Sequence, residues 1–267
     1  MNIMNIFDDN INKVNKCMIM TFRNVTVAKN LIDLLLKICI NVDVTIKFTE
    51  NRIKLEEIDS SKSTLVAINI KNNNLNEYFC PNELSIKINL DLMKKALKTI
   101  KKNNNNQNIL DNSLTLSIDE NKLDKMKLSY KGNSEDITID NSNYKHYKID
   151  SVEYAVGLKM NSTDLKKMLK AMMNKSNVFK ISVKNNKIDF FAGIAFEIEM
   201  GCFNISEGIN MCNFEICYEV DKLMRFINCY KFSDEITLYV KENYPLGIKF
   251  NISNIGQLIT FICPCEK

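Results

Sequence analysis

Apolar residues recur along the chain with two different spacings. In four segments they fall every three or four residues, which places them on one stripe and predicts an amphipathic helix. These segments are 29–40, 90–102, 162–173 and 219–230. After each of them, two short runs alternate apolar and polar residues around a polar turn, a pattern typical of an antiparallel β-hairpin. The predicted hairpins pair 42–48 with 53–58, 114–118 with 126–130, 178–183 with 188–193, and 235–240 with 246–252.

The helix and its hairpin form one pattern that occurs four times. Copies lie about 60 residues apart within each half and the halves are offset by about 130 residues, a period far above that of solenoid repeats. The chain is therefore predicted to contain two similar halves, each with two helices and many strands. Four helices are too few to cover both faces of a parallel sheet, so we expect an α+β fold with sheets outside and the helices grouped on one side.

A polar stretch without a helical stripe separates the two halves. We expect a first domain at 20–139, an interdomain linker at 140–153 and a second domain at 154–267. The residues before them, 1–19, are expected to form a flexible extension.

Charge is nearly balanced over the 267 residues. Lys and Arg total 36 against 32 Asp and Glu, so the net charge is only +4. This balance excludes a binder driven by overall positive charge, and any contact with nucleic acid must depend on where the charges lie. Nine cysteines without a secretory signal predict reduced thiols in an intracellular protein. Because no apolar run approaches the ~20 residues of a membrane span, we expect a soluble protein that does not bind membranes.

Two of the predicted helices carry a face of lysines with almost no acid. The lysines are Lys94, Lys95, Lys98, Lys101 and Lys102 in the first and Lys166, Lys167 and Lys170 in the second. The other two helices contribute Lys29, Lys37, Lys222 and Arg225. A solvated helix face is one interpretation, and a surface that faces phosphates is the other. Lysine acts as a point charge rather than a reader of bases, so any contact with DNA is expected to be independent of sequence.

No motif predicts a catalytic centre, a metal site or a cofactor. Asp59, Ser60 and Ser61 suggest an activated serine, but the only histidine, His146, lies in the predicted linker and no G-x-S-x-G elbow occurs. An Asp/Ser turn between strands is the favoured interpretation, and a serine hydrolase is the distant alternative. The seven glycines form no phosphate-binding loop, and the C-P-C run at 263–265 lacks zinc-site spacing.

Several stretches resemble the proliferating cell nuclear antigen (PCNA) family of sliding clamps. One is EEIDSSKSTLV at 56–66, and a second is EYFCPNELSIKINLDLMKKALK at 77–98. YAVGLKMNSTDLKKMLKAM at 154–172 is similar to the start of the second half of such clamps, and 236–264 is similar to their closing strands. The resemblance spans 20–265 in the family's order and coincides with the internal duplication.

The resemblance implies a DNA clamp fold and a function without catalysis. Clamps of this family are rings of three subunits, with helices that line the hole around duplex DNA and sheets that form the rim. We therefore expect a homotrimer that tethers DNA polymerase as a processivity factor in replication and repair. The expected partners are duplex DNA, a clamp loader and proteins with a PCNA-interacting peptide. The expected location is the nucleus, or a cytoplasmic replication site for a viral protein. The alternatives are a clamp-fold subunit of a heterotrimeric checkpoint ring and a viral clamp-like transcription factor.

The resemblance also implies a pocket for partner peptides near the linker. Its residues here are Ile58, Lys62, Tyr147, Ile149, Pro245, Phe261, Cys263 and Pro264. Lys62 stands where the family usually has histidine, so we expect a preference for peptides with an acidic residue at that edge. Burial of aromatic anchors provides the affinity of such pockets, and added polarity is expected to weaken it.

Overall fold

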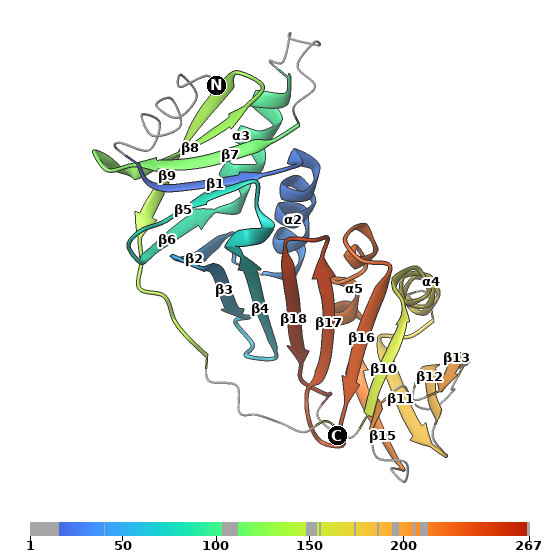
Figure 1. Cartoon of the computed structure of the whole chain (residues 1–267). Helices are drawn as coiled ribbons and strands as arrows, with labels where there is room; N and C mark the ends of the chain where they lie inside the picture. Colours follow the sequence, from blue (N-terminus) through green and yellow to red (C-terminus); the bar gives the residue numbers. More distant parts are fainter. Residues whose placement is uncertain are drawn as a thin grey trace, which may run out of the picture. The chain divides into compact units, whose positions relative to one another are not determined.

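Figure 1 shows the computed structural model, a chain of short helices and many strands. The structure describes residues 16–39, 41–102, 112–147, 154, 156–173, 175–185, 187–193, 198–204, 207–208 and 213–265. They fall into two compact units. Unit 1 contains Met1–Leu36, Asn41–Leu55 and Asn69–Lys145. Unit 2 contains Lys37–Ile40, Glu56–Ile68 and His146–Lys267.

The described residues of the first half form nine strands and two α-helices. In chain order they are β1 (Lys16–Phe22), α2 (Val25–Ile38), β2 (Asp43–Thr49), β3 (Arg52–Ile58), β4 (Thr64–Lys71), η1 (Asn72–Asn74), β5 (Glu77–Phe79), β6 (Leu84–Asn89), α3 (Leu90–Lys102), β7 (Leu114–Asp119), β8 (Lys122–Tyr130) and β9 (Asn133–Asn141). In unit 1 the strands are hydrogen-bonded in the order β3-β2-β6-β9-β8-β7-β1-β5. Seven strand pairs of this unit are antiparallel, as predicted for hairpins: β1–β5, β1–β7, β2–β3, β2–β6, β6–β9, β7–β8 and β8–β9.

The second half repeats the same succession of elements. They are β10 (Val156–Asn161), α4 (Ser162–Met173), β11 (Val178–Lys184), β12 (Lys187–Ala192), β13 (Ile198–Asn204), β14 (Glu207–Gly208), β15 (Phe214–Glu219), α5 (Val220–Met224), η2 (Cys229–Lys231), β16 (Glu235–Val240), β17 (Leu246–Ile252) and β18 (Gly256–Ile262). One sheet of unit 2 has the order β13-β12-β11-β15, and the other runs β14-β10-β16-β17-β18.

Strand order confirms the duplication that the sequence predicts. The series β3-β2-β6 of unit 1 corresponds to β12-β11-β15 of unit 2, and β9-β8-β7-β1-β5 corresponds to β18-β17-β16-β10-β14. The α+β class and the four predicted hairpins are therefore confirmed. The β8–β9 turn has positive φ at both central residues, Lys131 (49°) and Gly132 (80°), as a two-residue type I′ hairpin requires.

Asparagine side chains fix the starts of the three longer helices. Asn24 accepts the backbone N–H of Thr26 before α2, at 2.8 Å. Asn89 accepts the N–H of Leu92 before α3, and Asn161 accepts the N–H of Thr163 before α4. Each bond pairs one of the N–H groups that a helix start leaves without a partner.

Two predicted boundaries need correction. The helix predicted at 219–230 ends at Met224. From there through η2 the backbone forms tighter hydrogen bonds between residues three apart, such as the one from the Cys229 N–H to the Phe226 carbonyl at 2.9 Å. Phe226 and Cys229 are buried, so the chain turns there to place both in the core. At the other end, β1 begins at Lys16, before the predicted domain start at residue 20. Residues 1–15 and the last part of the predicted linker, 148–153, lie outside the described residues.

Candidate functional site

The lysine face of α3 is confirmed as the solvent side of an amphipathic helix. Met93, Ala96, Leu97 and Ile100 are buried, as the apolar stripe predicts. On the opposite side, Lys95 and Lys98 are exposed. Lys94 is half-buried and forms an ion pair with Asp33 of α2 at 2.8 Å, so part of its charge is used to join the two helices. The side chains of Lys101 and Lys102 lie outside the described part of the structure.

The lysines of α4 differ in how freely they face solvent. Lys167 is 79% exposed and pairs with Asp164 at 3.2 Å, and Lys170 is exposed. Lys166 lies over the ring of Tyr230, with 3.5 Å between the ammonium nitrogen and the ring centroid. Its hydrogen bond to the phenol and the charges of neighbouring lysines lower the pKa of Tyr230. This face is strongly cationic.

Of the remaining predicted DNA contacts, two lysines are exposed and the other two basic residues lie close to acidic side chains. Lys29 and Lys37 are exposed on α2. Lys222 pairs with Glu219 at 2.8 Å and is largely covered, and Arg225 lies 3.6 Å from the Asp59 carboxylate. The structure gives this last pair a role within unit 2.

Asp59 organises the turn between β3 and β4. Its side chain is 3% exposed and accepts three hydrogen bonds: from the N–H of Ser63 at 2.7 Å, the hydroxyl of Ser63 at 3.0 Å, and the N–H of Thr64 at 3.0 Å. Burial alone would raise the pKa of Asp59, but these donors outweigh it and the pKa is lowered. The carboxylate therefore stays ionised, and Lys62 takes a left-handed conformation (φ 55°) at the tip of the turn.

Several residues of the predicted partner pocket, including Lys62, Pro245 and Cys263, lie near one another in unit 2. The backbone N–H of Cys263 donates to the Ser63 carbonyl at 2.8 Å, and the Thr260 hydroxyl donates to the Leu65 carbonyl at 2.8 Å. These bonds place the end of β18 beside the Asp59 turn and bring Cys263 close to Lys62. The half-buried residues are Ile58, Tyr147, Pro245, Phe261, Cys263 and Pro264, whereas Lys62 is exposed. Ile149 lies outside the described residues.

Aromatic rings surround a glycine on the outer face of the β16-β17-β18 sheet. Gly247 pairs with Tyr239 on one side and with Phe261 on the other. A Cβ at Gly247 would meet the Tyr239 Cβ at 3.1 Å and the Phe261 ring at 3.7 Å. Tyr154 packs on Tyr239 with 5.8 Å between centroids, and its hydroxyl donates to the Pro245 carbonyl at 3.1 Å. The surface next to Pro245 and Phe261 is therefore apolar and aromatic.

Glu56 holds the start of the linker. Its carboxylate accepts the backbone N–H of Tyr147 at 2.9 Å and lies 3.0 Å from Nδ1 of His146. This contact could not be predicted from the sequence, because the two partners are 91 residues apart and no pattern connects them. It sets the position of Tyr147 relative to Ile58, two residues beyond Glu56 on β3.

Titratable groups elsewhere form no metal or nucleophile site in the described part of the chain. No group of three or more His, Cys, Asp or Glu there could hold a metal ion. Burial raises the pKa of the Cys39 and Cys229 thiols to about 12, which keeps both protonated. No described helix is long and apolar enough to cross a membrane.

Comparison with known proteins places these features in one family. The family model for the N-terminal domain of proliferating cell nuclear antigen matches residues 18–153, just over half of the chain. This chain belongs to the PCNA family. A probable DNA polymerase sliding clamp of Paramecium bursaria Chlorella virus 1 is 24% identical over 254 residues, covering 89% of this chain and 93% of the relative. Proliferating cell nuclear antigen 2 of Drosophila melanogaster is 21% identical over 238 residues, covering 82% and 87%.

A shorter match involves another virus. An uncharacterised protein of Acanthamoeba polyphaga mimivirus is 25% identical over 111 residues, which cover 40% of this chain and 33% of that protein. The full-length similarities to PCNA and to a viral clamp support the function of a sliding clamp, a DNA polymerase processivity factor. The family is a non-catalytic scaffold, and its α+β clamp fold agrees with the strand order described above.

Proposed function

We propose that this PCNA-family chain assembles as a homotrimeric ring around duplex DNA and tethers a DNA polymerase to it. The observation that carries the proposal is the similarity to a viral polymerase clamp along 89% of the chain. The strand duplication and the two lysine-bearing helices support it. We further propose that a clamp loader opens the ring, that repair proteins use it, and that it works in the nucleus or at a cytoplasmic viral replication site.

The proposed DNA contacts are basic residues of the helices. Lys95 and Lys98 on α3 and Lys167 and Lys170 on α4 have the strongest case, because their side chains are exposed and lie on the two lysine faces. The other proposed contacts are Lys29, Lys37, Lys94, Lys101, Lys102, Lys166, Lys222 and Arg225. Ammonium groups displace counterions from phosphates without reading bases, so the ring would hold DNA weakly and move along it.

The duplication also supports assembly through strand edges. In unit 2, residues 64–68 of β4 lie beside β18, and the Thr260 hydroxyl bonds the Leu65 carbonyl there. The counterparts of these strands are β13 and β9, and β13 is the last strand of its sheet in the described residues. A second copy that placed its β9 beside β13 would repeat the arrangement. Such a contact joins two different surfaces of the chain, β9 of one copy and β13 of the next. Repeated contacts of this kind close into a ring when the rotation from one copy to the next divides a full turn.

The proposed partner pocket consists of Ile58, Lys62, Tyr147, Ile149, Pro245, Phe261, Cys263 and Pro264. The half-buried apolar residues and the aromatic surface around Gly247 suit aromatic anchors of a short peptide. Ile58→Asp or Pro264→Asp would place a carboxylate there and is expected to abolish binding of a polymerase-tail peptide without dissociating the ring.

We propose that the protein has no hydrolytic activity. The Asp59 carboxylate is occupied by Ser63 and Thr64, and Nδ1 of the single histidine faces Glu56. Neither group is arranged as the base of a serine nucleophile.

Two measurements test the central proposal. Light scattering of the purified chain at micromolar concentration is expected to give three times the mass of 30.8 kDa. A mass of one subunit would refute the homotrimer and favour a heterotrimer or a monomeric relative. After loading by a clamp loader, the protein should stay on closed circular DNA and leave the same DNA once it is linearised. Equal loss from both forms would refute encirclement.

A further inference from the structure

The β8–β9 ladder of unit 1 separates before the strands end. Its register runs from Tyr130 paired with Asn133 to Lys125 paired with Thr138. If it continued, Asp124 would pair with Ile139 and Leu123 with Asp140. Instead β9 turns to β6, where Ile139 pairs with Ile88, Asp140 with Lys87 and Asn141 with Ile86. The start of β8 is thus left without a partner on β9.

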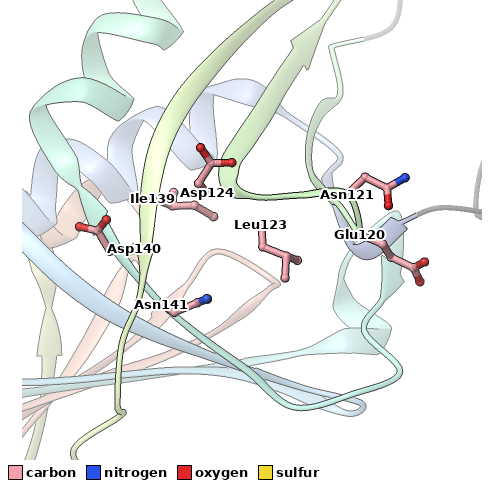
Figure 2. A pocket seen from close by; sticks show the side chains of 7 residues that line it. All are labelled: Glu120, Asn121, Leu123, Asp124, Ile139, Asp140 and Asn141. Carbon is pink, nitrogen blue, oxygen red and sulfur yellow. The ribbon is translucent and has the colours of Figure 1, made fainter.

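An open cavity of about 480 Å³ lies where the two strands separate. Figure 2 shows Leu123 in the middle of the lining residues, with Asp140 on the β9 side and Glu120 on the side of the β7–β8 turn. We call this cavity the notch, and it is lined by Glu120, Asn121, Leu123, Asp124, Ile139, Asp140 and Asn141. Leu123 is 44% exposed, one of the few large apolar side chains of the described surface to be so open.

The lining of the notch is acidic. Glu120, Asp124 and Asp140 are all exposed, and no lysine or arginine is among the lining residues. None of the ion pairs found between described residues involves these three carboxylates. Lysines on the same sheet form ion pairs with other acidic residues, as Lys87 does with Asp43 at 3.3 Å. The notch therefore combines a negative potential, an exposed leucine and an unpaired strand edge.

We propose that the notch is a docking site for an extended, lysine- or arginine-bearing segment of a partner protein. Such a segment would add as a short strand to the free edge of β8 at Leu123 and Asp124, because a strand edge offers unpaired N–H and C=O groups. Its basic side chains would meet the three carboxylates, and an apolar side chain would cover Leu123. The partner class differs from the peptides of the pocket in unit 2, where the exposed charge near the apolar surface is the cation Lys62.

The probe is a fluorescein-labelled peptide that alternates lysine and leucine, tested against a matched peptide that alternates glutamate and leucine. Fluorescence anisotropy with the full chain measures both affinities. The test variant is Asp124→Asn with Asp140→Asn. The control is Glu50→Gln with Asp234→Asn, which removes the same charge at two exposed positions outside the notch and outside β9. We expect the test variant to weaken binding of the lysine peptide about fivefold and the control to change it less than about twofold.

Hydrogen exchange separates strand addition from attraction by charge alone. In the peptide-bound protein one amide of the Leu123–Asp124 pair, the one whose N–H points to the notch, is expected to gain protection, whereas the amides of Asn133 and Ser134 at the far end of the ladder are not. The proposal is overturned if the glutamate peptide binds as well as the lysine peptide, if both variants weaken binding equally, or if no protection appears at the notch. Unchanged light-scattering mass and thermal unfolding of both variants verify that the fold is intact.

Discussion

Replacement of Asp59 by alanine tests whether the turn at 59–64 is organised by a buried carboxylate. The Thr64 N–H is buried and would lose its acceptor, and the Arg225 guanidinium, 3.6 Å away, would lose the charge that faces it. The two donors of Ser63 lie nearer to solvent and can turn to water. A buried donor left unpaired costs about 1–3 kcal/mol, and loss of one partner of a buried ion pair costs more. The variant no longer has to bury a charged carboxylate, and this gain offsets part of the two losses. We therefore expect Asp59→Ala to lower the free energy of unfolding by about 3 kcal/mol.

Asp59→Asn should cost less, about 2 kcal/mol, because the amide oxygen can still accept from the Ser63 and Thr64 amides, although the charge that faces Arg225 is lost. Ser60→Ala is the matched control, since Ser60 is exposed on the same turn. Urea unfolding monitored by circular dichroism gives the three values. An Asp59→Ala cost below about 1 kcal/mol, or a Ser60→Ala cost equal to it, would refute the organising role of Asp59.

The same turn predicts a dependence on pH. The folded pKa of Asp59 is lowered, so its contribution is present above the unfolded pKa and is lost as the pH falls through the folded value. The stability difference between the natural protein and Asp59→Asn should therefore be constant near neutral pH and shrink below about pH 4. A difference that persists unchanged into strong acid would contradict an ionised Asp59.

Three further predictions address the helices and the aromatic surface. Replacing Lys95, Lys98, Lys167 and Lys170 together by alanine should lower the slope of log affinity against log salt for DNA by about 3–4, whereas alanine at Lys122 and Lys125 on the β8 strand should leave it unchanged. Asn161→Ala removes the cap of α4 and should cost about 1 kcal/mol of unfolding free energy, with Asn161→Asp retaining most of it and exposed Asn254→Ala as the control. Gly247→Ala should cost about 1 kcal/mol, because the new methyl meets the Tyr239 Cβ, which the backbone holds in place.

Periodicity predicted the parts of the fold that local pattern determines. The stripes Met93-Ala96-Leu97-Ile100 and Leu165-Met168-Leu169-Met172 are buried as expected, because a helix of fixed pitch leaves no other face for them. The helix at 219–230 was predicted too long, since periodicity alone does not register that Phe226 and Cys229 enter the core through a turn. Family resemblance supplied the pocket residues, which no local pattern connects.

Contacts between distant segments could not be predicted in this way. The pairing of Lys94 with Asp33 depends on how two helices pack, and that of Tyr147 with Glu56 depends on where the linker returns to β3. The separation of β8 and β9 was also missed, because both strands alternate normally and only the competing partner β6 draws β9 away. The asparagine caps of α2, α3 and α4 stand in the sequence as an Asn just before each of these helices, a signal that hydrophobic periodicity does not contain.

Residues 56–68 belong to unit 2 although the ribosome makes them with the first half of the chain. Leu65 and Thr260, which share a hydrogen bond, are 195 residues apart. The nascent chain must therefore keep the β18-facing edge of β4 unpaired until β18 emerges, and the second half cannot complete its sheet without a segment from the first. Contacts this remote in sequence slow folding and extend the time during which a bare strand can join another molecule. Expression of 146–267 alone would leave the edge of β18 uncovered, so the second half needs the β4 segment of the first half to close off that edge.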